Sequence, residues 1–463
     1  MPLFQDSSTS SSPTVKSEFT QESSLVVACA FLVNAGGVAA AYTFGVFQEE
    51  YTNHVFTTSS EASVSIIGSI LASAMPVTGP LVGFLADKYG YSRIVCIGGI
   101  LQSLGWILAS FCTSLWQLYF TQGAMVGFGV SLINIPSAAI CSQWFQRQRG
   151  IATGIVVSGV GFGGFIFGPL TSALLQASDW QRTCRYLSII TGLTVILASR
   201  GLKENRKPKD STNISLSNVE MTSPQVQVCS PETSSEAPLT PLKADQKDEA
   251  KQPIKRLNTT VTDNQAHSPF TGGFNPVLAA IMLGNLIFSF GYFVPFIFLP
   301  SYCVDMGLNA SFGAFTISIL NISSAVGRLV LGRLGDCYGH FETMVACLSI
   351  AGVSLFFWPL CETKFPIVLF AICFGFFCGG YISLVPAACA RIFGIKYLAS
   401  YVGVIWFAAS AGNLSAGPIA GSLLDASGNW TNTILYAAFS MTSGSLVFFC
   451  AIKLIRSLQS ESK

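Results

Sequence analysis

Charged residues are scarce in this sequence. Only 10% of its 463 residues are Asp, Glu, Lys or Arg, whereas 51% are hydrophobic. A soluble domain carries about 25% charged residues, so this deficit excludes an ordinary water-facing surface and favours a chain surrounded by membrane lipid. The net charge is only +2, which leaves no basic field to attract nucleic acid.

The residues that build catalytic and metal centres are also thinly spread. There are three His, and the 14 Cys are scattered mostly within apolar runs, without a CxxC pair or a Cys/His cluster. A metal site or a disulfide framework is therefore not expected. The sequence also lacks a nucleophile–base pair and a phosphate-binding loop, so we predict that the chain is not an enzyme and needs no cofactor.

The long hydrophobic runs predict membrane helices. A bilayer core of about 30 Å needs about 20 apolar residues per helix. On that basis we predict an all-α polytopic membrane protein with twelve spans in two halves. The spans centre on residues 25–47, 62–85, 94–112, 116–140, 151–175, 184–201, 276–302, 310–333, 343–361, 366–390, 398–424 and 432–456.

Polar segments flank and separate the two halves. The segment between them is rich in Ser, Thr, Pro, Lys and Glu and poor in aromatics, which is typical of disorder. The expected organisation is a disordered tail over 1–24, a six-helix half over 25–201, a disordered linker over 202–273, a second half over 274–456 and a tail over 457–463.

Loop charges predict the orientation. Cations gather in the even-numbered connections, as at Arg93, Arg147 and Arg149, although one odd-numbered connection also carries two arginines. Positive loops stay in the cytoplasm, so both termini and the linker are predicted to be cytoplasmic. The membrane that we expect is the plasma membrane. The sequons at Asn309 and Asn429 then fall outside, where they are candidate glycosylation sites.

One eight-residue pattern occurs in both halves. Gly83-Phe-Leu-Ala-Asp87-Lys-Tyr-Gly90 ends the second span, and Gly332-Arg-Leu-Gly-Asp336-Cys-Tyr-Gly339 ends the eighth. Glycine permits a tight turn and close backbone approach, and the Asp can accept bonds from a helix N-terminus or a cation. We predict that the turn latches a cytoplasmic gate; the alternative is a capped turn with no switching role.

These features resemble the major facilitator superfamily. The first turn matches the loop signature of that superfamily down to Arg93. The stretch Trp144-Phe-Gln-Arg147-Gln-Arg149-Gly150, with the glycines that follow it, resembles the signature entering span five of the monocarboxylate porter family, particularly its fungal branch. The resemblance implies two pseudo-symmetric six-helix bundles and transport by alternating access.

The sequence also departs from that family. The motif that usually opens span one is absent. Animal members carry a Lys in span one where this chain has Tyr42, and an Asp one turn before an Arg in span eight where this chain has Ser324. The Arg itself is present as Arg328. The resemblance therefore implies that an anion site survives at Arg328 but that the proton relay of animal members does not carry over.

Arg328 is the main candidate for substrate binding. It precedes Asp336 by two helical turns, about 12 Å inside the membrane, and a buried Arg usually faces a cavity or a partner. A substrate carboxylate could bind it in bidentate geometry; bonding to helix carbonyls is the alternative. Asn34, Tyr42 and Tyr381 are further candidates, because helices one and four of each half usually border the cavity in the superfamily, although a helix–helix hydrogen bond is an alternative role for each.

The predicted function is transport of a small organic anion of the monocarboxylate type by alternating access. No acidic residue lies mid-span, so we expect facilitative transport or co-transport of a proton as the protonated substrate. Three alternatives stay open: export of a secondary metabolite, uptake of a vitamin-like solute, and a non-transporting membrane sensor.

Overall fold

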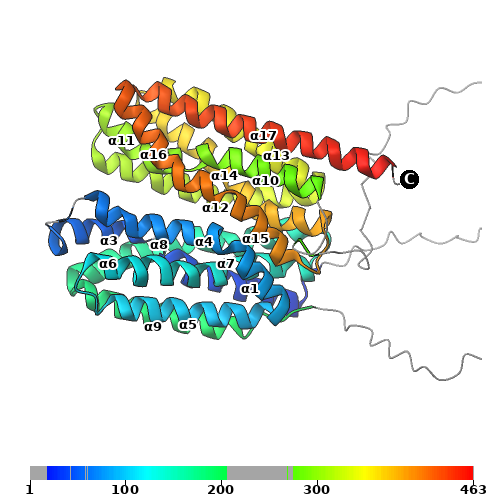
Figure 1. The fold of residues 1–463 in the computed structure, drawn as a ribbon, viewed down its shortest axis with the longest axis horizontal. Coiled ribbons are helices and arrows are strands. Elements are labelled where there is room, and N and C mark those ends of the chain that lie inside the picture. The colour runs from blue at the N-terminus through cyan, green and yellow to red at the C-terminus, as the bar shows by residue number, and fades with distance from the viewer. Residues whose placement is uncertain are drawn as a thin grey trace, which may run out of the picture. The chain divides into compact units, whose positions relative to one another are not determined.

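Helices make up nearly all of the described chain (Figure 1). The computed structural model describes residues 18–205 and 275–461, apart from Tyr42, Thr58 and Ser60, together with Ser268 and Pro269. Within this part, eleven helical stretches are long and apolar enough to cross a membrane. They are Gln21–Glu50, Ser63–Tyr89, Tyr91–Ala109, Leu115–Trp144, Arg149–Ala177, Pro276–Asp305, Phe315–Tyr338, His340–Leu360, Lys364–Ile392, Leu398–Ser427 and Trp430–Ser457.

The remaining predicted span is helix α9, Trp180–Ser199. Arg182 and Arg185 near its start make it less apolar than the other spans. It packs along α5 (Tyr91–Ala109), and Ser188 donates a hydrogen bond to the Ser103 carbonyl on α5 at 2.9 Å. Counting α9, the predicted twelve-helix architecture is confirmed.

The first half forms one bundle, and most of its helices are labelled in Figure 1. Its elements are α1 (Gln21–Val33), η1 (Asn34–Val38), α2 (Ala39–Ala41), α3 (Phe44–Glu50), η2 (Tyr51–Val55), α4 (Glu61–Tyr89), α5, α6 (Leu115–Leu118), η3 (Tyr119–Met125), α7 (Val126–Trp144), α8 (Arg149–Ala177) and α9.

The second half forms the other bundle. Its elements are α10 (Pro276–Tyr292), α11 (Val294–Asp305), α12 (Ala310–Tyr338), α13 (His340–Phe357), η5 (Trp358–Leu360), α14 (Lys364–Ile392), α15 (Leu398–Ala408), α16 (Ser410–Ser427) and α17 (Trp430–Glu461). Most of the predicted linker and the first 17 residues lie outside the described residues.

Several spans are interrupted where the sequence predicted continuous helices. Span one contains the π-helical turn Asn34–Val38, and span seven divides at Phe293 between α10 and α11. Pro295 lies in the first turn of α11, where a missing N–H costs little. In span one, Gln102 of α5 donates to the Gly37 carbonyl at 2.7 Å, so a side chain from span three holds the π-helical turn. Breaks of this kind give a helix a point about which it can bend.

The most extensive contacts between the two halves are two helix crossings related by the repeat. In the first, α4 lies on α15, with Gly79 against Gly403 and Gly83 against Ala399. In the second, α12 lies on α8. A Cβ added at any of these glycines would lie closer than 3.0 Å to a backbone atom of the partner helix. The glycines therefore set the distance between the halves.

Candidate functional site

The carboxylate of Asp87 bridges the halves at the first crossing. Asp87 lies in the last turn of α4, and its oxygens accept hydrogen bonds from the Ala399 amide at 3.3 Å and the Ser400 amide at 2.8 Å, at the start of α15. The Ser400 hydroxyl donates at 2.6 Å and the Tyr91 hydroxyl at 2.9 Å. A carboxylate at a helix N-terminus satisfies free amides and interacts favourably with the helix dipole. We call this set of bonds the Asp87 latch.

The repeat produces the same arrangement at the second crossing. Asp336 lies in the last turn of α12 and accepts hydrogen bonds from the Gly150 amide at 2.6 Å and the Ile151 amide at 3.0 Å, at the start of α8. His340 Nε2 lies 2.9 Å from Asp336 Oδ1, and both side chains are almost fully buried. We call this set the Asp336 latch. The Asp336 latch joins the second half to α8, which is span five of the first half. The Asp87 latch joins the first half to α15, which begins the corresponding span of the second half.

The glycines of the repeat lie at the turns after α4 and α12 and at the helix crossings. Gly90 and Gly339 follow the latch helices with φ angles of 101° and 115°, which side chains rarely adopt. Gly150 and Gly332 lie directly against each other at the second crossing. The prediction that the Asp accepts bonds from a helix N-terminus agrees with this geometry; whether the latch opens and closes stays a prediction.

Two glutamates beside the latches were not predicted from the sequence. Glu18 accepts hydrogen bonds from three successive backbone amides, those of residues 146–148, at 3.0–3.2 Å, just before α8 begins. Glu204 accepts from the Tyr91 amide at 2.5 Å, at the start of α5. Neither contact has a sequence signal, because the acceptors bind main-chain groups. They tie the segments before α1 and after α9 to the same face of the bundle as the latches.

Arg328 lies at the second crossing, between the two halves. Its Nη1 donates a hydrogen bond to the Val157 carbonyl of α8 at 2.7 Å, and its side chain is partly buried. The guanidinium is also within electrostatic reach of the Tyr292 hydroxyl and the Cys378 thiol. The sequence suggested no acidic partner for this Arg, and in this state a helix carbonyl of the opposite half serves as one acceptor.

Asn34 and Tyr381 each join the first and fourth spans of their half. Asn34 is fully buried. Its Nδ2 donates a hydrogen bond to the Ser137 hydroxyl at 2.9 Å, and its Oδ1 accepts one from Nδ2 of Asn134 at 3.0 Å. The Tyr381 hydroxyl donates to Asn285 Oδ1. Both side chains thus make the helix–helix bonds that were the alternative interpretation for these residues. Tyr42, the third candidate, lies outside the described residues.

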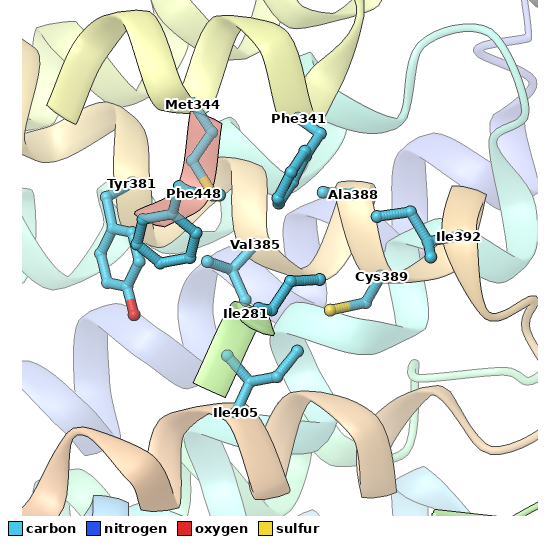
Figure 2. A pocket seen from close by; sticks show the side chains of 10 residues that line it. All are labelled: Ile281, Phe341, Met344, Tyr381, Val385, Ala388, Cys389, Ile392, Ile405 and Phe448. Atoms are coloured by element: carbon cyan, nitrogen blue, oxygen red, sulfur yellow. The ribbon is translucent and has the colours of Figure 1, made fainter. Parts of the chain in front are cut away.

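Tyr381 also borders a small crevice within the second half (Figure 2). Apolar side chains of five helices form most of its wall, with Tyr381 at one end and Ile392 at the other. The lining residues are Ile281, Phe341, Met344, Tyr381, Val385, Ala388, Cys389, Ile392, Ile405 and Phe448. Arg328 does not line it, so Tyr381 and Arg328 do not share this crevice.

The remaining predicted residues lie at the surfaces of the bundle. Arg93 and Arg147 are exposed, whereas Arg149 bonds the Phe145 carbonyl through Nε at 2.7 Å. Asn309 and Asn429 are exposed, and their side-chain oxygens cap the starts of α12 and α17 through the Phe312 and Thr431 amides, each at 2.9 Å. Exposure suits a glycosylation acceptor, which stays a prediction for both.

A family model supplies the decisive comparison. The Major Facilitator Superfamily model matches residues 24–364 and, in a second match, residues 281–463. The chain belongs to the Major Facilitator Superfamily. Its place in this family of transporters, with two bundles joined at helix crossings, makes it a multi-pass membrane protein that works by alternating access.

Curated relatives agree over nearly the whole chain. It is 27% identical to the MFS transporter asaE of Aspergillus flavus over 92% of this chain and 86% of the relative. It is 28% identical to human monocarboxylate transporter 12 over 94% of this chain and 82% of the relative. It is 24% identical to the agnestins efflux protein AgnL12 of Paecilomyces divaricatus over 94% of this chain and 88% of the relative. The expected likeness to monocarboxylate porters and to fungal transporters is confirmed.

A solved structure supports the fold alone. The superfamily transporter FucP, solved in an outward conformation, aligns with a TM-score of 0.65 at 13% identity, over 94% of this chain and 99% of FucP. Such low identity carries no information about substrate.

Proposed function

We propose that the chain carries small organic anions of the monocarboxylate type across the plasma membrane, with both termini in the cytoplasm. The observation that carries this proposal is Arg328, an arginine held between the two halves on a membrane-spanning helix. A fixed cation costs free energy in lipid and is retained where it binds a partner. The relation to a monocarboxylate transporter gives independent support.

Arg328 suits alternating access because it already contacts both halves. It belongs to α12, and one of its present acceptors is the Val157 carbonyl of α8. A carboxylate offers two charged oxygens and bonds a guanidinium more strongly than a neutral carbonyl does. A bound substrate would therefore take the place of Val157 as acceptor and allow α8 and α12 to separate. Asn34 and Tyr381, which bond within their own halves, would then keep each half rigid while it moves.

The positions of the acidic residues bear on whether transport is coupled to protons. Asp87 and Asp336 lie where helices of the two halves cross, and both carboxylates accept hydrogen bonds from backbone amides of the opposite half. We therefore propose facilitative transport, or transport of the substrate together with its proton. Uptake into sealed vesicles with and without a pH gradient tests this point. Gradient-driven accumulation of a permanently charged substrate would contradict it.

The test of the substrate class is labelled-solute uptake in transport-deficient yeast. We expect Arg328→Ala to reduce carboxylate uptake more than tenfold, with Arg328→Lys retaining part of it, because Lys keeps the charge but not the bidentate geometry. Arg333→Ala is the matched control, since Arg333 lies on the same helix but is exposed. Unchanged carboxylate uptake by Arg328→Ala at equal surface expression would overturn the proposal.

A second candidate is export of a secondary metabolite. The relation to an agnestins efflux protein favours it. Efflux from preloaded cells that is insensitive to Arg328→Ala, with no carboxylate uptake by the wild type, would support this candidate. A non-transporting sensor would move no solute in either direction.

A further inference from the structure

A cluster of aromatic rings surrounds Tyr292, the last residue of α10. The centroid of the Tyr292 ring lies 5.0–6.0 Å from four other rings, three of which belong to the same span and one to α14. Rings at such separations attract one another beyond the burial of their apolar surface. We call Tyr292 and these four residues the aromatic cluster; the four are Phe288, Phe293, Phe296 and Tyr381.

The close packing of α12 on α14 brings Arg328 to this cluster. A Cβ added at Gly327 would lie closer than 3.0 Å to a carbonyl oxygen of α14, so the Arg328 side chain starts directly beside that helix. Its guanidinium lies within electrostatic reach of the Tyr292 hydroxyl and of the Cys378 thiol on α14. Nη1 meanwhile reaches the Val157 carbonyl of the other half. The guanidinium therefore lies between α8 on one side and the aromatic cluster on the other.

The first half faces Arg328 with small side chains. On α8, Gly154 lies against the main chain of Arg328, and a Cβ added at Gly161 would lie 3.0 Å from the Cβ of Ala325. A solute whose carboxylate replaces Val157 as acceptor would thus meet glycine and valine on one side and aromatic rings on the other. The rings are the side of this space that can select the body of the solute.

The aromatic cluster is held in place by hydrogen bonds within the second half. The Tyr381 hydroxyl donates to Asn285 Oδ1, and Asn285 Nδ2 donates to the Ile405 carbonyl of α15 at 2.5 Å. Both Tyr381 and Asn285 are buried. The Tyr381 ring in turn lies 6.0 Å from that of Tyr292. A surface that is fixed before binding loses little conformational freedom when a solute lands on it.

The repeat shows that only one of the two crossings carries a cation at this level. Arg328 precedes Asp336 by eight residues, whereas the residue eight positions before Asp87 is Gly79. Gly79 packs directly on Gly403 of α15. A single fixed cation balances a single carboxylate, so the arrangement suits a solute with one negative charge.

We propose that the preferred solutes are monocarboxylates that carry an aromatic ring, with the carboxylate bound to Arg328 and the ring packed against Tyr292 and Phe296. This inference rests on the proposed function, because it refines which carboxylates the same site accepts. Ring–ring contacts favour an aromatic ring over a saturated ring of the same size by about two- to tenfold. Burial of the whole ring favours it over a methyl group by at least about tenfold.

Counterflow in proteoliposomes containing the full chain tests this preference. The probe is labelled 3-phenylpropionate, and the competitors are unlabelled propionate, 3-phenylpropionate and 3-cyclohexylpropionate. Vesicles with Arg328→Ala give the background, which removes passage of the free acids through lipid. We expect 3-phenylpropionate to compete at concentrations at least about tenfold lower than propionate and about two- to tenfold lower than 3-cyclohexylpropionate. The cyclohexyl acid is the more apolar of the two ring compounds, so general hydrophobicity predicts the opposite order.

Variants of single rings assign the preference to the aromatic cluster. Tyr292→Leu should reduce the ratio between propionate and 3-phenylpropionate at least about threefold, since it removes the central ring; Phe296→Leu serves the same purpose if that variant does not fold. Phe365→Leu is the matched control, because Phe365 lies on α14 but is 75% exposed. It should keep the ratio of the wild type.

The outcomes separate this inference from the proposed function. Equal competition by the three acids, a preference for the cyclohexyl acid, or a ratio in both ring variants equal to that of the wild type would each overturn the aromatic preference. Labelled propionate is followed in parallel. Exchange of propionate that depends on Arg328, without exchange of 3-phenylpropionate, would overturn this inference and leave the proposed function standing. Exchange of neither label would contradict both.

Discussion

The second crossing offers a steric test of how the halves move. Gly150 on α8 and Gly332 on α12 lie so close that a Cβ on either would fall within 3.0 Å of the other's carbonyl oxygen. Overpacking of this kind typically costs about 1–3 kcal/mol. In Gly150→Ala that cost falls on the closed crossing alone, because the two glycines separate when it opens. The ratio of the open to the closed population should therefore rise by about 5- to 150-fold.

The readout should be taken at the other crossing. If the halves rock as rigid bodies, opening at Gly150 also releases the Ala399 and Ser400 amides from Asp87. We expect Gly150→Ala to speed hydrogen exchange at these two amides at least fivefold. Gly164→Ala is the control, since no atom lies within 4 Å of a Cβ added at Gly164 on the same helix. Faster exchange confined to the Gly150 segment, or equal behaviour of the two variants, would refute rigid-body rocking.

Three further predictions follow from single contacts. Asp87→Asn replaces a carboxylate that accepts hydrogen bonds from backbone amides and hydroxyl groups, so we expect it to destabilise the closed state by about 2–4 kcal/mol. The readout is faster hydrogen exchange at the start of α15; unchanged exchange would contradict the latch. Tyr381→Phe leaves Asn285 Oδ1 without its Tyr381 donor, so we expect the free energy of unfolding to fall by about 1–3 kcal/mol, seen as a lower melting temperature in detergent. Tyr338→Phe, at an exposed site, is the control and should leave the melting temperature unchanged. Glu18→Ala should speed exchange of the three amides before α8 about fivefold or more, and an unchanged rate would show that the contact contributes nothing.

Much of the fold could be predicted from composition and periodicity. Apolar runs located all twelve spans because lipid allows few charges along a helix. The interruptions were missed, although Pro295 gave a local signal for the division of span seven. The π-helical turn at Asn34–Val38 contains the adjacent glycines Gly36 and Gly37, but its bond to Gln102 from another span had no sequence signal.

For each contact in the candidate site, the sequence predicted the side chain but not the main-chain group that binds it. The repeat identified Asp87 and Asp336 as acceptors, but their donors are main-chain amides in the opposite half, which have no sequence signature. The Val157 carbonyl that binds Arg328 was hidden for the same reason. His340 did have a signal, because comparing the two turns one residue further shows Tyr in one and His in the other.

The most direct test of the central claim is counterflow in proteoliposomes. Vesicles containing the purified chain are loaded with an unlabelled monocarboxylate and diluted into a trace of the labelled compound. A carrier with one site that faces each side in turn must exchange the two, so the account predicts a transient accumulation of label that Arg328→Ala abolishes and Arg333→Ala retains. Label that merely equilibrates at the rate of protein-free vesicles, for every carboxylate tried, would contradict it.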